Sequence, residues 1–163
     1  MPEQSPIRPT DDDARALARD LIDAATFCAL GTLDPASGAP QVTRIALATL
    51  PDGTPITLVS DLAAHTRALR ANPAASLLIG EPGPKGDPLT HARLTLRATA
   101  RFVERESPDH AALRDRYLAR NPKARLYADF ADFHFVVFIP EGASLNGGFG
   151  AAFELTAEDL ARK

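Results

Sequence analysis

The stretch TFCALGTLDPASGAPQVTRIALATLPDGTPITLVS, residues 26–60, decides the fold of this chain. It holds three largely apolar runs, separated by the turn-forming segments PASGAP at residues 35–40 and PDGTP at residues 51–55. An Asp-Gly pair is typical of tight hairpins. Strands joined by such short connections pair antiparallel, because a parallel pair needs a much longer crossover. The stretch therefore predicts an antiparallel meander of three strands rather than parallel βαβ units.

Further strands and helices are expected on both sides of this stretch. Strands are expected in ASLLIGE (75–81), ARLTLRATARFVE (92–104), DFHFVVFIP (132–140) and after the glycine-rich segment 144–150; helices are expected in 11–25, in 61–72, from Ser107-Pro108 to residue 120, and after Thr156. Six or so mostly antiparallel strands with helices between them predict an α+β fold built on a closed barrel. Residues 1–10 are interpreted as a flexible tail, and residues 11–163 as a single domain.

Length, charge and composition exclude several classes of protein. The 163 residues suit one domain of about 150 residues. The formal net charge of −3 lacks the basic footprint of a nucleic-acid-binding protein. No apolar run approaches the ~20 residues of a membrane span, and the N-terminus lacks the apolar core of a signal peptide. We therefore expect a cytoplasmic protein with neither nucleic acid nor membrane as a partner.

Cysteine and histidine give no sign of a metal site. The single cysteine, Cys28, lies in an apolar run and is expected to be a small buried hydrophobe. The four histidines are scattered, and no two of them are four residues apart as ligands on one helix face would be. No metal ligand is assigned.

The segment LVSDLAAHTRALRANP, residues 58–73, brings hydroxyls and cations to one strand-to-helix junction. Helix N-termini attract anions, Ser60 and Thr66 add hydroxyl donors, and Arg67 can bind a phosphate with two N–H groups. Arg44, on a neighbouring strand, can reach the same end of the barrel. The other interpretation is that Ser60 or Asp61 caps a helix and that the arginines are solvated. The residues alone favour the two interpretations equally.

Two other segments have a structural and a functional interpretation. Along residues 93–101 arginine and threonine alternate with apolar residues, which is typical of a strand with one polar face. We expect Arg93 and Arg97 to lie at a subunit interface or to bind an anion there, and Arg101 to be solvated. The glycines of NGGFG, residues 146–150, form either a tight turn or a close approach of the backbone to a flat ligand.

The order of these segments resembles the FMN-binding split-barrel superfamily, to which the pyridoxamine 5′-phosphate oxidases belong. The resemblance covers roughly residues 14–156 and is carried by Arg44 and by LVSDLAAHTRALRANPAASLLI, GDPLTHARLTLRATA, NPKARLYADFADFHF and LNGGFG. The branch of haem-utilisation (HugZ-type) proteins is the most similar. The resemblance implies an α+β, Greek-key type split barrel with peripheral helices, and a homodimer that binds FMN between its subunits.

The resemblance also implies which residues bind the cofactor. Matched to the family, they are Arg44, Ser60, the phosphate segment His65, Thr66 and Arg67, then Arg93 and Thr95 from the other subunit, and Asn146 and Gly147 near the flavin ring. It assigns no catalytic residue.

Departures from the family pattern limit the expected function. Pyridoxamine-phosphate oxidases carry a second cation where this chain has Thr49, a lysine where it has His65, and a C-terminal Arg-x-His motif where it reads FELTAED, residues 153–159. We therefore expect an FMN-binding oxidoreductase acting on a small-molecule redox substrate, not a true pyridoxamine-phosphate oxidase.

Two alternatives are a haem-binding or haem-degrading protein of the HugZ type and a non-catalytic ligand-binding protein. The haem ligand of HugZ-type proteins is a histidine in a further C-terminal segment. The last histidine of this chain is His134, so that route is not expected here.

Overall fold

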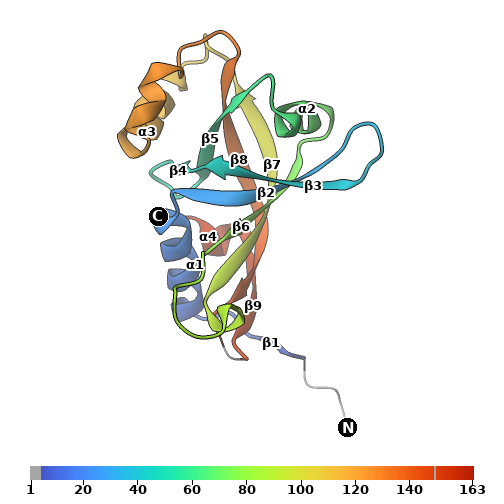
Figure 1. Ribbon diagram of the computed structural model, residues 1–163. Coiled ribbons are helices and arrows are strands. Elements are labelled where there is room, and N and C mark those ends of the chain that lie inside the picture. The colour runs from blue at the N-terminus through green and yellow to red at the C-terminus, as the bar shows by residue number, and fades with distance from the viewer. Residues whose placement is uncertain (1–4, 149) are drawn as a thin grey trace.

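The computed structural model of the protein describes residues 5–148 and 150–163. The strands are β1 (Ile7–Arg8), β2 (Phe27–Leu33), β3 (Pro40–Ala46), β4 (Ala48–Thr49), β5 (Pro55–Ser60), β6 (Ala74–Ile79), β7 (Arg93–Val103), β8 (Phe133–Asn146) and β9 (Ala152–Thr156). The α-helices are α1 (Asp12–Ala24), α2 (Ala64–Ala71), α3 (His110–Arg120) and α4 (Ala157–Leu160), and the 3₁₀ helices are η1 (Pro88–Thr90) and η2 (Pro122–Leu126). Figure 1 shows α2 and α3 on opposite sides of the sheet, with α1 and α4 together near the C-terminus.

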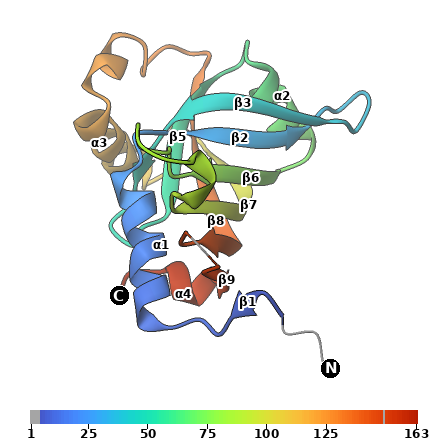
Figure 2. The same cartoon turned by 60° about the horizontal axis from the view of Figure 1, so that its bottom comes forward.

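The strands form one mixed sheet in an α+β fold, as expected. Its order is β1-β9-β8-β7-β6-β2-β3, and β5 pairs with β8 and with β4. The sheet is not closed, since no backbone ladder joins β3 to β5 in the described part of the chain. Figure 2 shows β3, β2, β6 and β7 side by side in this order. One side chain bridges the gap: the hydroxyl of Thr57 donates to the carbonyl of Ala46 at 2.6 Å. The split barrel is thus confirmed, and the closed barrel expected from the strand pattern alone is wrong.

Both hairpins of the predicted meander form, but its middle strand is interrupted. β2 and β3 pair antiparallel from Phe27↔Ala46 to Leu33↔Pro40, and the short β4 pairs antiparallel with the start of β5 through Ala48↔Ile56 and Thr49↔Pro55. From Ile56 to Ser60, β5 also pairs with β8, and it does not pair with β3. β3 ends at Ala46, and Leu47 separates it from β4. The N–H of Leu47 donates to the carbonyl of Thr26 at 2.9 Å, and its carbonyl accepts from Asn121 Nδ2 at 3.2 Å.

Strand β8 is longer than the sequence predicted, because it continues past Pro140 to Asn146. The register shifts opposite Arg97 and Ala98, and Pro140 stands across from Ala98 at this irregularity. A proline, which has no N–H to donate, is tolerated where a bulge interrupts the ladder. The 14 residues of β8 therefore run from the α2 end of the barrel to the glycine-rich loop.

Part of the segment expected to be a tail lies against the sheet. Ile7 and Arg8 form β1 and pair in parallel with Ala152 and Phe153 of β9. Thr10 Oγ1 also donates to the carbonyl of Glu154 at 2.7 Å. The reason is that β9 otherwise leaves one edge unpaired, and an unpaired edge accepts a further strand.

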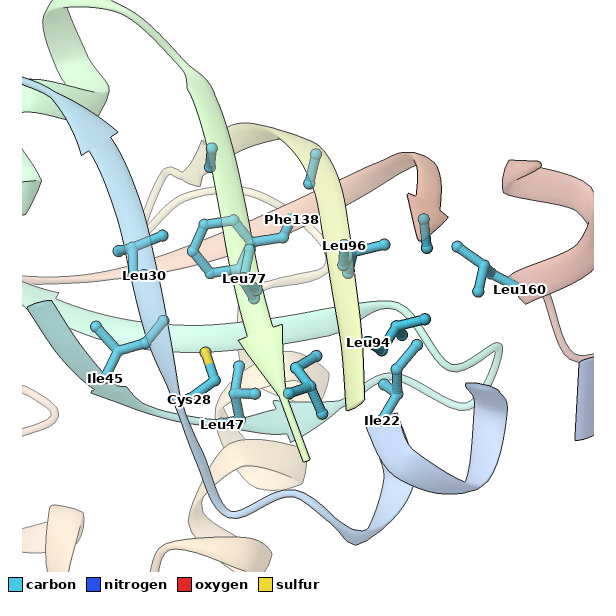
Figure 3. Packing of buried hydrophobic residues seen from close by; sticks show 14 of the residues in the cluster. Ile22, Cys28, Leu30, Ile45, Leu47, Leu77, Leu94, Leu96, Phe138 and Leu160 are labelled. Carbon is cyan, nitrogen blue, oxygen red and sulfur yellow. The ribbon is translucent and has the colours of Figure 1, made fainter. Parts of the chain in front are cut away.

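Buried apolar side chains fill the space between the sheet and α1 (Figure 3). Ala14, Ala18 and Ile22 form the buried stripe of α1. Cys28 is 2% exposed, and burial raises the pKa of its thiol to about 12, so it is the inert hydrophobe that was expected. No helix in the described ranges is both long enough and apolar enough for a membrane crossing.

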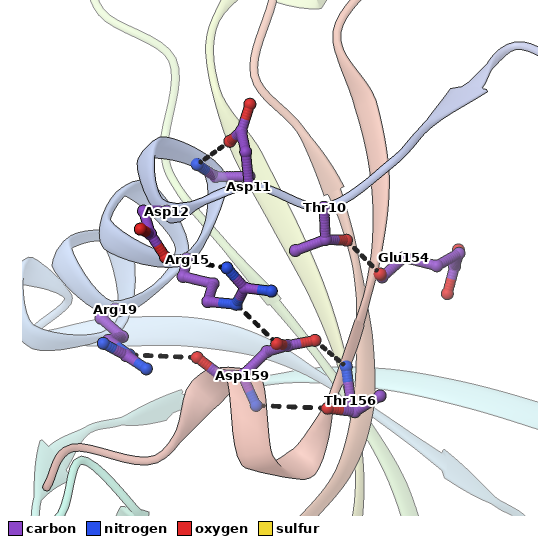
Figure 4. Close-up of polar contacts among 9 residues, drawn as sticks. Thr10, Asp11, Asp12, Arg15, Arg19, Glu154, Thr156 and Asp159 are labelled. Carbon is purple, nitrogen blue, oxygen red and sulfur yellow. Dashed lines mark hydrogen bonds and ion pairs between the residues drawn. The ribbon is translucent and has the colours of Figure 1, made fainter.

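A polar clamp fixes α4 against α1 (Figure 4). The carboxylate of Asp159 accepts from Arg15 Nε at 2.7 Å, and its backbone carbonyl accepts from Arg19 Nε at 3.0 Å. Asp159 and Thr156 also form a capping box at the start of α4, and the helix predicted after Thr156 is confirmed. The clamp fixes the last helix relative to the first.

Candidate functional site

The junction between β5 and α2 is held by its own hydroxyl groups. Thr66, 1% exposed, donates from Oγ1 to the carbonyl of Ser60 at 2.6 Å, and Ser60 Oγ accepts from the amide of Leu62 at 3.2 Å. The hydroxyl proton of Thr66 therefore has a partner inside the chain. These bonds hold the loop before α2, but the N-cap of α2 is Ala63 and has no side-chain cap, so the interpretation that Ser60 or Asp61 caps the helix is wrong.

His65 links α2 to β3 and is not a cation at neutral pH. Its Nδ1 lies 3.0 Å from the hydroxyl of Thr43. The half-buried ring is desolvated, which lowers the pKa of the imidazole below its ordinary value. The position at which the oxidases carry a lysine thus presents a neutral imidazole.

The arginines near this junction are exposed and partly engaged. Arg67 Nη1 donates to the carbonyl of Leu62 at 3.1 Å, and the Arg44 guanidinium lies 5.5 Å above the ring of Phe27. Arg70 lies 4.1 Å above the ring of Phe102. Each keeps further N–H groups for a ligand, since a guanidinium has five.

A contact between Asp61 and His134, which the sequence did not predict, holds the loop before α2. Asp61 accepts from His134 Nε2 at 3.0 Å, and its amide donates to the carbonyl of Asp132 at 2.8 Å. The hydrogen bond from His134 is the main reason that the pKa of Asp61 lies below its usual value. The two side chains are 73 positions apart, so no local pattern signals the contact.

The second predicted group lies around the glycine-rich loop. Arg93 Nη1 donates to the carbonyl of Leu89 at 2.9 Å. Asn146 Oδ1 accepts from the amide of Gly148 at 3.1 Å, and the amide of Gly147 donates to the carbonyl of Ala151 at 2.7 Å. Phe149 lies outside the described residues. The described glycines of this segment therefore form the tight turn that one interpretation expected.

The polar face of β7 finds its negative partners within the chain. Arg97 donates to Ser144 Oγ at 3.1 Å and to Glu154 Oε2 at 3.2 Å. Arg101 lies 3.4 Å from the carboxylate of Asp109. These contacts relieve the mutual repulsion of the alternate arginines without an external anion.

The strands align side chains in rows across the face of the sheet that points away from the core, here called the outer sheet face. One row runs Arg44, Ala29, Leu78, Thr95, Ser144, and the next runs Val42, Gly31, Ser76, Arg97. Val42 is 73% exposed and Leu78 49%. A shallow recess of about 410 Å³ lies around Gly31, Val42, Ser76 and Arg97. This face combines exposed apolar surface with guanidinium groups.

The structure brings some of the predicted residues together and keeps others apart. Arg44 and Thr95 share one row, three strand spacings or roughly 14 Å apart. Ser60 pairs with Phe133 at the start of β8, whereas Asn146 ends it, up to roughly 40 Å along the strand. One small ligand cannot touch both ends of β8 in a single chain. Among the described residues no cluster of three or more His, Cys, Asp or Glu side chains could hold a metal ion.

Comparison with known proteins supports the resemblance drawn from the sequence. The non-canonical haem oxygenase HOZ from the chloroplast of Arabidopsis thaliana is 41% identical over 117 residues, which are 71% of this chain and 34% of HOZ. A haem binding protein from Mycobacterium smegmatis is 32% identical, with a TM-score of 0.83 over 94% of this chain and 61% of that one. HutZ, the haem storage protein of Vibrio cholerae, is 25% identical, with a TM-score of 0.68 over 77% of this chain and 89% of HutZ.

The extent of these matches differs. This chain spans about a third of the length of HOZ and less than two thirds of the mycobacterial protein. The family model described as pyridoxamine 5′-phosphate oxidase, by contrast, matches residues 14–146 and so covers most of the chain. The chain therefore belongs to the pyridoxamine 5′-phosphate oxidase family.

Proposed function

We propose that the chain is a haem-binding protein, and that two copies bind haem between their outer sheet faces, beside α2. The observation that carries this proposal is the chemistry of the outer sheet face. Exposed Leu78 shares one row with Arg44, and exposed Val42 shares the next row with Arg97. Haem is a planar, largely apolar ring with two carboxylates, so it needs both kinds of surface. The likeness to HOZ and to the mycobacterial haem binding protein supports the same ligand.

The junction before α2 is less suited to a phosphate than the family pattern implies. His65 is neutral, the hydroxyl proton of Thr66 is donated inside the chain, and Arg67 uses one N–H on Leu62. A phosphate carries close to two negative charges at neutral pH and is bound best by several free cations. This favours haem over FMN.

FMN remains the second candidate, on one specific observation. In the part of the chain that the structure describes, the amides of Ala64 and His65 at the start of α2 have no hydrogen-bond acceptor. Free amides at a helix N-terminus bind phosphate groups. Arg67 lies one turn further along the same helix.

Two copies are needed because the site residues lie at both ends of β8. Residues near α2 and residues near the glycine-rich loop lie at opposite ends of this strand. A two-fold arrangement of two sheets places one end of each copy against the other end of its partner. When bound, haem supplies an iron that can exchange electrons with a small redox substrate; the chain binds and orients it.

Spectral titration tests this function. The purified protein, freed of ligand, is titrated separately with haemin and with FMN, and each titration is followed by visible absorbance. We expect a Soret band that saturates at about one haem per chain, and FMN binding that is weaker. Saturation with FMN and no Soret band would replace haem by flavin. Absence of both at micromolar ligand would identify a carrier of another molecule.

A further inference from the structure

Gly31, in the interior of β2, is a glycine that the fold itself does not require. Its φ is not positive. A Cβ here would lie 3.5 Å from the carbonyl oxygen of Ser76 and 3.7 Å from the Cβ of that residue, which are ordinary van der Waals distances. Every other glycine of the described residues has a positive φ, or an atom 3.4 Å or less from where its Cβ would stand. The backbone around position 31 would therefore accept alanine.

Glycine at this position also weakens the strand. It loses more conformational freedom on folding than alanine does, and it offers no side chain to pack. A glycine inside a strand often marks a place where a ligand or another backbone comes close. Since nothing within the chain needs the space beside Gly31, the space is explained by a molecule outside it.

The missing side chain leaves the floor of the recess on the outer sheet face. Leu30 and Thr32, on either side of Gly31, are buried, so position 31 faces outward. The recess of about 410 Å³ lies over Gly31 and over Ser76, its partner on β6. It spans four neighbouring strands, β3, β2, β6 and β7 (Figure 2). The other side chains that face outward around it are apolar or charged: Leu33, Pro40, Val42, Ala74, Arg97, Glu141.

The two charged side chains at the rim are held in place by other side chains. Arg97 donates to Ser144 Oγ at 3.1 Å and to Glu154 Oε2 at 3.2 Å, and it keeps further N–H groups for a ligand. The carboxylate of Glu141 accepts from the hydroxyl of Thr99. A carboxylate on a bound molecule would be attracted to Arg97 and repelled by Glu141. The rim therefore favours one orientation of an apolar ligand that carries a carboxylate at its edge.

We propose that Gly31 is a specificity-determining residue of the haem site: one edge of the ring enters the recess and lies against the backbone of β2 and β6, with a carboxylate beside Arg97. The inference rests on the proposed haem-binding function and names the residue that makes room for the ring. A side chain at position 31 would occupy the space that the ring needs.

A series of substitutions of increasing size tests this inference. Gly31→Ala, Gly31→Val and Gly31→Leu are each freed of ligand and titrated with haemin. The Kd is expected to rise with the size of the side chain, by about tenfold or more for valine and leucine, because a filled recess cannot also hold the ring. Ser76→Leu, which fills the same recess from β6, should weaken binding in the same way. The control Ala112→Leu adds bulk at an exposed position of α3, outside the recess, and should bind haemin as the wild type does.

Stability and oligomeric state are measured on the same variants. Chemical denaturation should show Gly31→Ala to be at least as stable as the wild type, since alanine fits the backbone there. If valine and leucine prevent folding, Gly31→Ala and Ser76→Leu decide the matter. Light scattering of the haem-free proteins should show the same oligomeric state for Gly31→Val and wild type.

The outcomes separate this inference from the proposed function. If the wild-type protein binds no haem, the proposed function fails and the role of Gly31 with it. If the wild type binds haem and the folded Gly31 variants and Ser76→Leu bind it equally well, the role of Gly31 alone is overturned. Loss of the dimer by Gly31→Val without haem would also overturn it, because the space would then serve the partner chain rather than the ring.

Discussion

At the scale of single residues, burial lowers the pKa of the His65 imidazole, which the sequence alone does not reveal. Its ring lies between Thr43 and α2, where the charged form loses hydration. In the unfolded chain the same imidazole has a pKa of about 6.5. The folded state therefore resists a proton that the unfolded state accepts.

This difference predicts a pH dependence of stability. Stability from neutral His65 is present above the unfolded pKa and is lost as the pH falls through about 6.5 towards the lower folded value. We expect the free energy of unfolding of the wild type to fall more between about pH 7.5 and 5.5 than that of His65→Gln. Denaturant titrations at several pH values measure it. Parallel curves for the two proteins would contradict the prediction, since the other histidines are common to both.

Gly80, directly after β6, is required by its surroundings as well as by its backbone conformation. Its φ is +106°, and a Cβ here would lie 2.7 Å from the carbonyl oxygen of Ala92. Gly38 also has a positive φ, of +72°, but a Cβ there would meet nothing within 4 Å. Both glycines have a backbone conformation that is unfavourable for alanine, but only at Gly80 would a Cβ also clash with neighbouring atoms.

Alanine at the two positions should therefore differ in effect. We expect Gly80→Ala to lower the free energy of unfolding by about 1–3 kcal/mol more than Gly38→Ala, because only the former forces packed backbone apart. Chemical denaturation of both variants measures the difference. Equal losses would mean that the backbone near Ala92 yields easily.

At the scale of elements, the clamp between α1 and α4 depends on one carboxylate. Asp159 is bound by Arg15 and by the first amide of the capping box, and these contacts lower the pKa of its carboxyl group. The ionised carboxylate therefore contributes to the free energy of unfolding above the unfolded pKa of about 3.9. This contribution is lost as the pH falls through the lower pKa of the folded state.

Removing this charge should loosen the last helix. Asp159→Asn is expected to lower the thermal midpoint by a few degrees at neutral pH, and the difference from wild type should shrink as the pH falls below the unfolded pKa of about 3.9. The exposed Asp20, 3.7 Å from Arg162, provides the control Asp20→Asn, which should change little. Thermal scans across pH follow both variants. A deficit that persists unchanged in acid would argue against the charge as its cause.

The elements also show how far the sequence could predict the fold. The first hairpin and the alternation of β7 follow from local turn chemistry and periodicity, and both are found in the structure. The pairing of β5 with β8 does not, because strand pairing over 70 or more residues depends on how the whole sheet assembles. The extension of β8 beyond Pro140 was not predicted, because a proline normally ends a strand. Here the register shift between β7 and β8 lets the strand continue.

The candidate site was predictable to a similar degree. The sequence indicated the exposed arginines Arg44 and Arg67, as well as the threonine face of β7. It could not indicate that Glu154, 57 positions away, neutralises Arg97, or that Thr43 holds His65. These contacts are made in three dimensions by residues that are ordinary in their own segments.

At the scale of the whole molecule, the outer sheet face determines how the chain is expected to associate. Val42 is 73% exposed on this face, and Leu126, on η2, is 79% exposed elsewhere. A charge introduced into an apolar surface that is buried in an assembly destabilises the assembly. A charge introduced into an apolar surface that remains in water does not.

A charge on this face should therefore break the proposed dimer. We expect Val42→Glu to give a monomer and Leu126→Glu to leave the dimer intact, as determined by size-exclusion chromatography with light scattering. A wild-type monomer, or a dimer that tolerates Val42→Glu, would exclude this face as the interface. Haem binding should be lost together with the dimer if both sheet faces contribute to the site.

The length of β8 has a genetic consequence. Because the two ends of the proposed site lie at opposite ends of this strand, each site in a dimer would draw one end from each copy. A chain damaged near α2 and a second chain damaged near the glycine-rich loop would then rebuild one intact site when they pair. Two alleles that each fail alone would complement each other when expressed together, and the mixed dimer would carry one haem where the wild type carries two.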